Sequence, residues 1–470
     1  MTTFYIEQFG CRATQADGAA IERQLREQGF HAEENRAAAD VVVLNTCTVT
    51  AAADTQARDA IRKIHAANPR SRIIVTGCYA QRAPEELAAL PGVSFVVGNS
   101  HKPQIPSLVN RMQPLRAVSS GFEFLPVEML SYTAKASEDA TAQILTGNVF
   151  DLTDVLVAPV LGGEGNHTRP TLKIQDGCNS RCSFCVIPFV RGRSRSLSPA
   201  TVVSELQRLT DAGFREVVLS GINLGTYGRD LSPQVEFLEL LQQILNETSV
   251  ERLRISSIEP LDVTRDLIGL FASSERFAPH FHMPLQSGSD HILAAMHRWY
   301  RAEHYARRVE LIRENLPNAA VGADVICGFP GETEAEHEAT MRFIAERSFT
   351  YLHVFSYSSR PGTRAATLPG HNPGHVIKRR ARELRALGET KAEAFRRSQI
   401  GRRLRVVTLR RDPKDDPQET PALAENYVSV KILQALPPNE FLTVVAAGVD
   451  GKQVVGSALE ASVSAVGGAA

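Results

Sequence analysis

The most constraining feature of this sequence is a CxxxCxxC motif formed by Cys178, Cys182 and Cys185. Three thiolates this close in sequence can each bind one iron of a [4Fe–4S] cube and leave the fourth iron free to chelate a small molecule. Zinc sites with four cysteines usually have two CxxC pairs instead. The alternatives are a zinc site completed by a distant residue, or cysteines without a shared role. Gly177 before the motif and the strand-like run at 171–174 favour a cluster-binding loop.

Length and composition indicate an ordinary globular protein with several domains. The chain has 470 residues, 43% of them hydrophobic and 22% charged, and its formal net charge is zero. Any nucleic-acid-binding surface must therefore come from local clusters of basic residues. Seven cysteines in a chain of this length do not suit a secreted disulfide framework. The sequence shows no signal-peptide pattern and no long apolar run, so we expect no membrane segment and a cytoplasmic location.

Strand-like and helix-like stretches alternate along the first part of the chain. Such alternation predicts an α/β domain with a parallel sheet, which we assign to residues 1–116. Residues 117–168 are weakly patterned and are predicted to form an insertion and linker. The predicted elements of the first domain are strands at 3–8, 40–45 and 71–76 and helices at 16–28 and 51–67.

The alternation resumes over residues 169–397, which we expect to hold six βα units. Six units are fewer than the eight of a closed barrel, so we predict a partial (βα)6 barrel. Residues 398–470 change to short β runs and are predicted to form a small β-barrel. After the strand that precedes Cys178, the predicted central strands lie at 215–220, 252–257, 280–284, 320–326 and 351–356. The β runs of the final part lie at 404–409, 427–432 and 441–446.

A second set of three cysteines, Cys11, Cys47 and Cys78, is scattered over the first domain. Each follows directly after one of the first three strands, in a strand-to-helix loop. In an open parallel sheet such loops lie along one edge, where ligands bind, so we expect the three thiols to converge. Three unrelated buried thiols are the plain alternative, because free cysteine is often buried. That alternative does not explain the equivalent positions, and we favour a second [4Fe–4S] cluster over zinc.

Two cysteine sets in this arrangement resemble the radical S-adenosylmethionine superfamily and, within it, the methylthiotransferases. The resemblance extends over nearly the whole chain. It implies a central barrel of the radical S-adenosylmethionine type and a terminal barrel of the TRAM type, an OB-like module that binds RNA. The motifs that carry it are NTCTVT (45–50), TGCYAQ (76–81), CVIPFVRG (185–192), LQSGSD (285–290), DVICGFPGET (324–333) and FSYSSRPGT (355–363).

The residues after Cys47 distinguish branches of this family. CTVT at 47–50 resembles the branch that modifies C2 of N6-threonylcarbamoyladenosine at position 37 of tRNA, next to the anticodon. The isopentenyladenosine branch usually has serine and isoleucine there, and the branch acting on a ribosomal-protein aspartate has glycine and phenylalanine. The chain departs from the first branch at 12–17, where RATQAD replaces the more usual Val-Asn-Gln-Tyr-Glu. The stretch 117–168 is also longer than that branch leads us to expect.

The resemblance divides the chemistry between the two cysteine sets. The CxxxCxxC set would hold the cluster that binds S-adenosylmethionine and cleaves it reductively to a 5′-deoxyadenosyl radical. The scattered set would hold the cluster that carries the sulfur, which a second S-adenosylmethionine methylates. An electron donor such as flavodoxin or ferredoxin is implied. Cys327 is left over in an apolar strand and is predicted to be a core residue.

Small and polar residues near the ends of the central strands are candidate contacts to S-adenosylmethionine. In such folds the loops at the carboxyl ends of the strands build the pocket. Ordinary turn chemistry at a strand end is the alternative for each of them. The candidates are Ser220, Gly221, Asn223, Ser257, Glu259, Gln286 and Ser287.

Basic residues before the terminal barrel predict RNA binding. Residues 371–411 contain thirteen Lys or Arg and three Glu, a net charge of +10, and they lead into the barrel. A solvated helix face is the usual meaning of such a run. Three arginines after the cluster loop could also neutralise a phosphate. The candidate RNA contacts are Arg191, Arg193, Arg195, Arg402, Arg403 and Arg405.

The sequence leaves three functions open. The first is a tRNA methylthiotransferase, the second a methylthiotransferase acting on a ribosomal protein, and the third a non-catalytic iron–sulfur electron carrier. A carrier needs closed clusters with four cysteine ligands. Neither cysteine set has a fourth member, so we discount the carrier.

Overall fold

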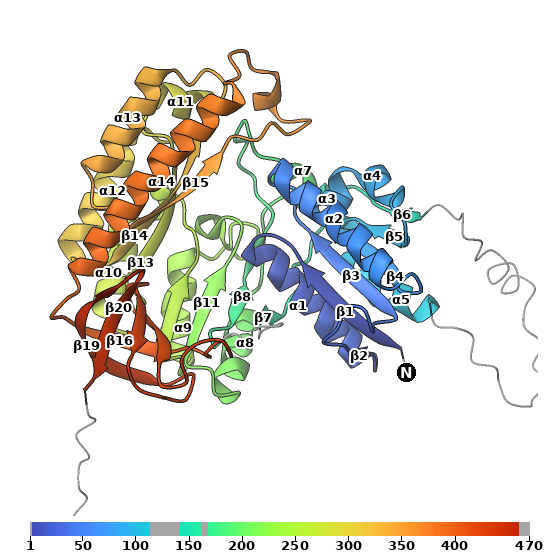
Figure 1. The fold of residues 1–470 in the computed structure, drawn as a ribbon, viewed down its shortest axis with the longest axis horizontal. Helices are drawn as coiled ribbons and strands as arrows, with labels where there is room; N and C mark the ends of the chain where they lie inside the picture. Colours follow the sequence, from blue (N-terminus) through green and yellow to red (C-terminus); the bar gives the residue numbers. More distant parts are fainter. Residues whose placement is uncertain (1, 113–141, 161–167, 460–470) are drawn as a thin grey trace, which may run out of the picture.

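The computed structural model describes residues 2–112, 142–160 and 168–459, which form three parts (Figure 1). An amino-terminal α/β part, drawn in blue, lies beside a central part with two sheets, drawn from green to orange. A small β-barrel, drawn in red, packs at one end of the central part. The predicted fold class is therefore confirmed: a parallel α/β domain, a barrel-like central part and a terminal β-barrel.

The amino-terminal sheet is parallel throughout, with strand order β2-β1-β3-β4-β5-β6. The predicted strands are confirmed as β1 (Thr3–Gln8), β3 (Val41–Thr46) and β4 (Arg72–Gly77). Every residue of β3 is buried, because alternate side chains pack towards α1 (Arg12–Glu27) on one face and α2 (Ala51–Ala67) on the other. The other elements are β2 (His31–Ala32), α3 (Cys78–Arg82), α4 (Pro84–Ala88), β5 (Val93–Val97), η1 (Asn99–Gln104) and α5 (Ile105–Arg111).

The stretch predicted as an insertion and linker contributes strands to both neighbouring sheets. β6 (Gln143–Leu145) extends the amino-terminal sheet beside β5, and β7 (Pro159–Val160) pairs antiparallel with β8 (Thr171–Lys173) of the central part. The first domain thus includes an edge strand beyond the boundary predicted at residue 116. Strands this short carry too little alternation to be recognised in a sequence. The rest of that prediction, at 117–141 and 161–167, lies outside the described residues.

Six parallel strands form the central part, arranged as two sheets that meet at β12 and β13. One sheet runs β12-β11-β8 and the other runs β13-β14-β15. Two parallel bridges, Leu253 with Phe277 and Ser257 with His282, join them. This open arrangement confirms the predicted partial barrel of six strands. After β8 the strands are β11 (Glu216–Ser220), β12 (Arg252–Ile255), β13 (His280–Gln286), β14 (Ala320–Cys327) and β15 (Tyr351–Ser356).

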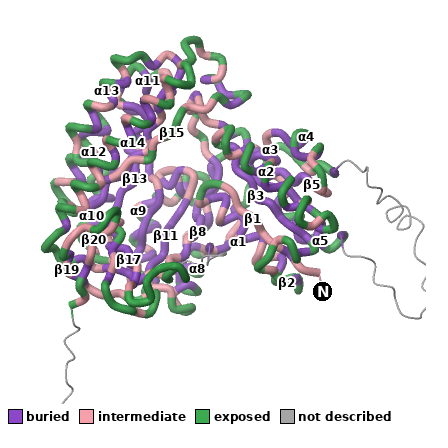
Figure 2. Tube along the Cα trace, viewed as in Figure 1, coloured by how far each residue is buried: buried purple, intermediate pink, exposed green. Residues whose placement is uncertain are grey.

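The helices of the central part enclose one apolar core with these strands. Leu219 of β11 and Phe281 of β13 belong to the same buried cluster as Leu240 of α9. Figure 2 shows the central strands as buried, with exposed residues on the outer helices. No described helix is both long and apolar enough to cross a membrane. The helices are α7 (Ile187–Arg191), α8 (Pro199–Asp211), α9 (Phe237–Glu247), α10 (Arg265–Ser273), α11 (Asp290–Ala295), α12 (Ala302–Asn315), α13 (Glu334–Ala345) and α14 (Gly374–Arg397). The short elements are η2 (Val149–Asp151), β9 (Gln175–Asp176), β10 (Arg195–Ser196), η3 (Leu224–Thr226), η4 (Pro260–Asp262) and η5 (Arg364–Thr367).

The carboxyl-terminal part is a closed barrel with strand order β16-β17-β18-β20-β19. The three predicted β runs are confirmed as β16 (Arg403–Thr408), β18 (Ser429–Ile432) and β19 (Phe441–Asp450). β17 (Thr420–Ala424) and β20 (Gln453–Ala458) complete the barrel. Closure leaves no free strand edge, which is how a sheet this small avoids edge-to-edge pairing with other chains.

Buried charges dock the barrel on the central sheet. Glu216 of β11 pairs with Arg252 at 3.2 Å and with Arg254 at 2.9 Å. The arginines also donate to barrel carbonyl oxygens, Arg252 to Arg405 at 2.8 Å and Arg254 to Ala424 at 3.2 Å. Burial alone would raise the pKa of Glu216, but the neighbouring arginines lower it to about 2. The carboxylate therefore stays charged and holds both arginines against the barrel.

Candidate active site

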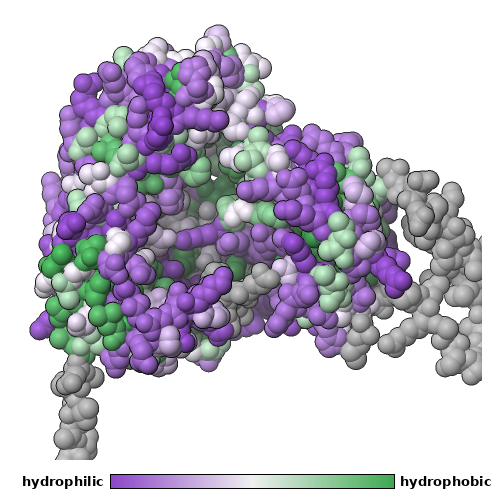
Figure 3. Space-filling view, in the orientation of Figure 1, coloured by the Kyte–Doolittle hydropathy of each residue, from purple (hydrophilic) through white to green (hydrophobic). Residues whose placement is uncertain are grey.

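A cavity of about 540 Å³ lies where the three parts of the molecule meet. Its lining includes Cys11 of the amino-terminal part, the three CxxxCxxC cysteines, and Tyr427 of the barrel. Figure 3 shows the surface hollowed between the amino-terminal and central parts. The loops that line the cavity follow the carboxyl ends of parallel strands, where α/β folds bind ligands.

Hydrogen-bond donors approach the sulfurs of the CxxxCxxC motif in the loop after β9. The backbone nitrogen of Ser180 lies 3.4 Å from Cys178 Sγ. Arg298 Nη1 lies 3.1 Å from Cys182 Sγ. Donors of this kind stabilise negative charge on sulfur and tune an iron–sulfur site.

The three scattered cysteines converge at one edge of the amino-terminal sheet, as their positions predict. Gly10 has φ 107°, and a Cβ added there would lie 2.4 Å from Cys47 Cβ, so the chain before Cys11 passes directly against Cys47. Burial raises the pKa of Cys47 to about 12, with further contributions from Cys78 and Cys11. The three thiols are therefore close enough to act on one another.

Polar groups also approach these three sulfurs. The Thr14 hydroxyl lies 3.6 Å from Cys11 Sγ. The Val49 backbone nitrogen lies 3.5 Å from Cys47 Sγ. The Asn99 amide nitrogen lies 3.7 Å from Cys78 Sγ. Asn99 donates as well to the backbone oxygen of Val190 in α7 at 2.6 Å. Because α7 directly follows the CxxxCxxC loop, Asn99 connects the two cysteine sites.

The donor sets fit iron–sulfur clusters. Burial raises the pKa of the Cys47 and Cys185 thiols to about 12, so neither ionises near neutral pH without a metal. Metal binding displaces those protons, and the nearby N–H groups then face charged sulfur. Each set offers three sulfurs, and the seventh described cysteine, Cys327, belongs to neither. Three ligands leave one position of a [4Fe–4S] cube open.

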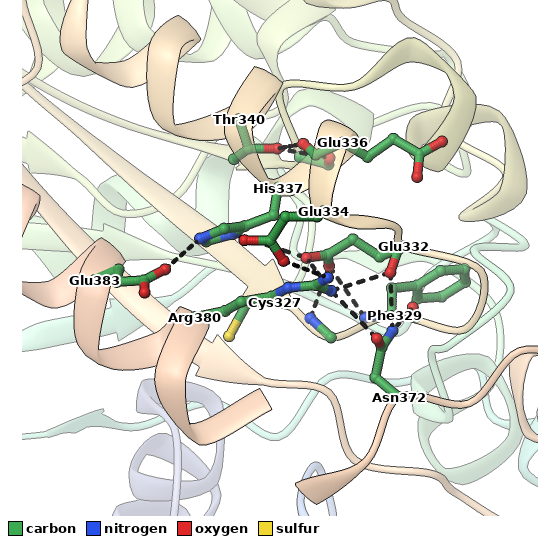
Figure 4. Close-up of polar contacts among 12 residues, drawn as sticks. Cys327, Phe329, Glu332, Glu334, Glu336, His337, Thr340, Asn372, Arg380 and Glu383 are labelled. Carbon is green, nitrogen blue, oxygen red and sulfur yellow. Dashed lines mark hydrogen bonds and ion pairs between the residues drawn. The ribbon is translucent and has the colours of Figure 1, made fainter. Parts of the chain in front are cut away.

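Cys327 ends β14 inside the core, as predicted. It is 1% exposed, and its thiol donates to the backbone oxygen of Phe355 at 3.5 Å. Figure 4 shows it with the buried pair of Glu332 and Arg380, which are 3.0 Å apart. Glu332 also accepts from the backbone nitrogen of Gly328 at 2.7 Å. These contacts hold the loop after β14, so the acid of the GFPGET run has a structural role here.

Six of the seven candidate contacts to S-adenosylmethionine line the cavity. Asn223 Oδ1 and Gln286 Oε1 are buried without a hydrogen-bond partner in the described part of the chain, which makes them available to a ligand. Gln286 has φ 63° at an irregularity in β13, and such strained conformations cluster at ligand sites. The six lining residues are Ser220, Gly221, Asn223, Ser257, Glu259 and Gln286.

The seventh candidate, Ser287, lies outside the cavity, which corrects its prediction. Its buried hydroxyl is 3.2 Å from Thr340 Oγ1 of α13 and accepts from the backbone nitrogen of Ser289 at 3.1 Å. Successive side chains at the end of a strand point to opposite sides. Gln286 therefore faces the cavity, whereas Ser287 faces the helix layer.

Arg298 connects the cluster loop to the cavity wall, and it was not predicted from the sequence. Its guanidinium contacts Cys182 and forms an ion pair with Glu259. Burial raises the pKa of Glu259, which Arg298 partly offsets. Only its nearness in sequence to the LQSGSD motif could have drawn attention to Arg298.

A chain of hydrogen bonds along β13, β14 and β15 forms another unpredicted wall of the cavity. His282 lies 2.9 Å from both Asp324 and the Tyr351 hydroxyl, which is also 2.7 Å from His280. His353 is 3.3 Å from Asp324. The ligand atoms of His282, Asp324 and His353 lie within 4.8 Å of one another, but they already satisfy each other, so we assign no ion to them. The sequence could have indicated this group, because His280 and His282 alternate in one predicted strand and Tyr351 and His353 alternate in another, and alternate positions of a strand share a face.

Two of the three arginines predicted to meet an RNA phosphate after the cluster loop are buried instead. Arg191 pairs with Asp17 at 3.0 Å and with Asp176 at 2.9 Å. Arg195 donates to the backbone oxygens of Arg191 and Arg193 at 2.8 and 2.9 Å. Their prediction is corrected, because reaching a phosphate would leave buried partners unpaired. Arg193 is exposed and stays a candidate.

Part of the basic run at 371–411 is neutralised within the central part. Arg379 and Arg380 of α14 lie 2.6 and 3.2 Å from the same Glu334 oxygen, and Arg380 also pairs with Glu332. Figure 4 shows Arg380 among these acids. The surface available to RNA therefore carries less charge than the sequence suggests.

The three arginines at the start of the barrel differ in their availability. Arg402 and Arg403 are exposed, and Arg402 contacts the Asn318 side chain. Arg405 is half-buried, with its guanidinium 4.7 Å from the centre of the Phe441 ring. The first two can meet a phosphate without leaving a buried partner unpaired.

The fold and the cavity define an iron–sulfur enzyme of the radical S-adenosylmethionine class. Residues 172–344 match the family model of the Radical SAM superfamily, and residues 3–98 match that of "Uncharacterized protein family UPF0004". Among solved structures, the fold is similar to the radical S-adenosylmethionine methyltransferase TsrM from Kitasatospora setae, with cobalamin and a [4Fe-4S] cluster bound. The TM-score is 0.54 at 17% identity, covering 78% of this chain and 77% of that one.

Curated relatives narrow the class. The chain is 36% identical over 426 residues to the threonylcarbamoyladenosine tRNA methylthiotransferase MtaB of Aquifex aeolicus (strain VF5), which covers 90% of this chain and 95% of the relative. It is 37% identical to the protein of that name from Bacillus subtilis (strain 168), covering 84% and 82%. It is 36% identical to the tRNA-2-methylthio-N(6)-dimethylallyladenosine synthase of Syntrophobacter fumaroxidans, covering 82% and 79%. The chain belongs to the radical S-adenosylmethionine methylthiotransferases and is MtaB-like within them. The cofactors of that family, [4Fe–4S] clusters and S-adenosylmethionine, fit the two cysteine sites and the cavity.

Proposed function

We propose that this chain adds a methylthio group to C2 of N6-threonylcarbamoyladenosine at position 37 of tRNA. The proposal rests mainly on the similarity to the Aquifex relative named threonylcarbamoyladenosine tRNA methylthiotransferase, which is 36% identical to this chain over 95% of its own length. The run CTVT at 47–50 is typical of the same branch. A dimethylallyladenosine substrate is the second candidate, because relatives with that name also align over most of the chain.

The cavity gives the two cysteine sites a shared volume in which a substrate base could lie. Cys11 and the CxxxCxxC cysteines line the same space. We assign the first cluster to Cys178, Cys182 and Cys185, and the sulfur-carrying cluster to Cys11, Cys47 and Cys78. When bound, the clusters and S-adenosylmethionine supply the radical and the methylthio sulfur.

The chain's own polar groups orient what binds in this volume. Asn223 Oδ1 and Gln286 Oε1 can accept hydrogen bonds from an amine or a ribose hydroxyl. Glu259 is placed by Arg298, which also contacts Cys182, so one guanidinium connects ligand site and cluster site. Ser220, Gly221 and Ser257 complete the proposed S-adenosylmethionine contacts.

We infer that the barrel and the loop after the cluster motif hold the RNA. The barrel is OB-like in its closure, and we regard it as a TRAM module. Arg402, Arg403 and Arg193 are exposed and can bind phosphates, while the modified base of the anticodon loop is extruded into the cavity. Arg405 can assist from its half-buried position. A cytoplasmic location follows from a tRNA substrate.

A second cavity, of about 530 Å³, also reaches the first cluster site. Cys182 and Cys185 line both cavities. On this second lining, Arg181 and Arg364 are exposed and form no ion pair within the described residues, and Phe189 is 53% exposed. A cationic and aromatic rim suits an acidic electron carrier. We infer that flavodoxin or ferredoxin delivers electrons there.

The direct test uses anaerobically reconstituted enzyme with S-adenosylmethionine and a reductant. Three substrates are compared by mass spectrometry: an anticodon stem-loop with threonylcarbamoyladenosine, the same RNA with isopentenyladenosine, and a ribosomal protein with a target aspartate. We expect a methylthio product from the first alone. A product from the second RNA alone would replace the proposal with the second candidate, and a product from the protein alone would overturn both.

A further inference from the structure

Arg12 is a cation on the wall of the main cavity that has no partner of its own. It is the first residue of α1, directly after Cys11, and it is half-buried. Within the part of the chain that the structure describes, its guanidinium makes no hydrogen bond and no ion pair. Most other charged groups of the cavity wall are paired, so this one stands out.

Arg12 lies close to the wall formed by β13 and β15. Burial, with smaller contributions that include the charge of Arg12, lowers the pKa of His280. Burial raises the pKa of Tyr351, and the charge of Arg12 acts to lower it. Arg12 of the amino-terminal part thus lines the same cavity as His280 and Tyr351 of the central part, which is the space proposed for the substrate base.

Among the residues that the structure describes, no carboxylate pairs with Arg12. Glu259 forms an ion pair with Arg298. Asp324 contacts His282 and His353. α1 has no acidic residue in its first turn, so the helix terminus adds to the positive potential. A cation in the first turn is unfavourable for the helix itself, which means that helix stability does not explain Arg12.

Aromatic rings and a buried polar atom without a hydrogen-bond partner in the described chain also belong to the lining of this cavity. Tyr427 of the barrel stacks on His280 with ring centroids 4.2 Å apart. His280 is 3% exposed, and its Nδ1 has no hydrogen-bond partner in the described chain. A ligand with a flat ring and an anionic substituent would match this combination.

We propose that Arg12 binds the carboxylate of the threonyl group on the substrate base. The inference rests on the proposed function and names the residue that selects that substrate. N6-threonylcarbamoyladenosine carries a carboxylate, which a guanidinium can bind through two parallel hydrogen bonds. A dimethylallyl group is apolar, so it would bury the Arg12 guanidinium without offering it a hydrogen-bond acceptor. The cost of that unpaired charge would disfavour binding of the dimethylallyl substrate.

Two other partners would leave different signatures. A tRNA phosphate at Arg12 would make its loss weaken every RNA equally, whatever base stands at position 37. Compensation of the charge on the cluster at Cys11 would leave RNA affinity unchanged and would alter the absorption and electron paramagnetic resonance spectra of that cluster.

The experiment measures the affinity of anaerobically reconstituted enzyme for three stem-loop RNAs of one sequence. They carry threonylcarbamoyladenosine, its neutral methyl ester, or unmodified adenosine. We expect the wild type to bind the first about tenfold or more tightly than the other two. Arg12→Gln should abolish that preference and change affinity for unmodified RNA by less than about threefold, and Arg12→Lys should keep part of the preference.

Arg26→Gln is the matched control, because Arg26 lies on the same helix but is exposed and paired with Glu22 at 2.9 Å. It should leave all three affinities unchanged. Equal weakening of all RNAs by Arg12→Gln, or an unchanged preference for the carboxylate, would overturn the inference. The proposed function fails separately: the wild-type enzyme would then methylthiolate isopentenyladenosine RNA and not threonylcarbamoyladenosine RNA, whatever Arg12 does.

Discussion

Arg191 Nη2 lies 3.0 Å from Asp17 Oδ2, and this buried pair joins the amino-terminal part to the central part between the two cysteine sites. Asp17 belongs to α1, which starts directly after Cys11. Arg191 ends α7, the helix that follows Cys185. This pair, together with the Asn99 contact to Val190 and the ion pair of Asp17 with Lys173, fixes the relative position of the two sites, which we regard as halves of a single active site.

Replacing Asp17 by Asn should destabilise the protein strongly. Lys102, Lys173 and Arg191 all contact this carboxylate in the interior, and the substitution leaves them short of a negative charge. We expect a loss of about 3–5 kcal/mol in the free energy of unfolding. Urea denaturation of the apoprotein measures it. Asp59→Asn is the control, because within the described part of the chain Asp59 forms its one ion pair with exposed Arg62, and the change should cost less than about 1 kcal/mol. Similar costs for both would contradict a structural role for the network.

Stability should fall as the pH drops through the carboxyl range, with Asp176 among the causes. Burial alone would raise the pKa of Asp176, but Arg191 and Lys173 hold it well below 3.8. The unfolded chain then binds the proton first, so the stabilisation is present above the unfolded pKa and is lost as pH falls towards the folded one. Unfolding free energies of the apoprotein between about pH 6 and pH 3 test this, since Asp176→Asn should flatten the slope. An identical slope in the variant would contradict it.

The two cysteine sets should fail in different ways. Changing Cys178, Cys182 and Cys185 to Ala should remove about four of roughly eight irons and abolish formation of 5′-deoxyadenosine. Changing the scattered set to Ala should remove the other four irons but leave cleavage of S-adenosylmethionine in place without methylthio transfer. Iron analysis and product chromatography after anaerobic reconstitution give both results. Transfer at the wild-type rate in the second triple variant would refute the division of labour, and Cys327→Ala should leave the iron content unchanged.

Charge reversal at Arg402 and Arg403 should weaken tRNA binding and reduce its salt dependence. Both are exposed, and each phosphate that is no longer bound should lower the slope of log affinity against log salt by about 0.7–0.9. Affinity at low salt should fall about tenfold or more. Deletion of the whole barrel is a poorer test, because the barrel satisfies Arg254 and provides Tyr427 to the cavity. Arg208→Glu on α8 is the control. A gel-shift titration at two salt concentrations measures the affinity for tRNA and its salt dependence. If the variant and the control have the same affinity and salt slope, RNA binds to another surface.

Local features of the sequence predicted most of the fold and the cysteine sites. The strand ends before Cys11, Cys47 and Cys78 were predictable, because strands of this length have a recognisable hydrophobic pattern. Their convergence was predictable because parallel strands bring their carboxyl ends to one edge of the sheet. The short edge strands β6 and β7 could not be read, because two or three residues show no periodicity.

Contacts between distant segments were the part that the sequence did not reveal. Arg191 looks like a free cation after a cluster loop, and only tertiary structure pairs it with Asp17, 174 positions away. Arg298 was missed for the same reason, because its partner Cys182 lies 116 positions earlier. Charge runs and strand-end residues identify candidates, whereas burial decides whether each serves a ligand or the fold.

The proposed activity can be tested in cells by mass spectrometry of tRNA nucleosides from strains with and without this gene. We expect 2-methylthio-N6-threonylcarbamoyladenosine to be lost in the deletion strain while N6-threonylcarbamoyladenosine accumulates. The wild-type gene should restore the product, and a Cys47→Ala copy should not. Loss of the methylthio derivative of isopentenyladenosine with threonylcarbamoyladenosine products unchanged would contradict the proposed activity.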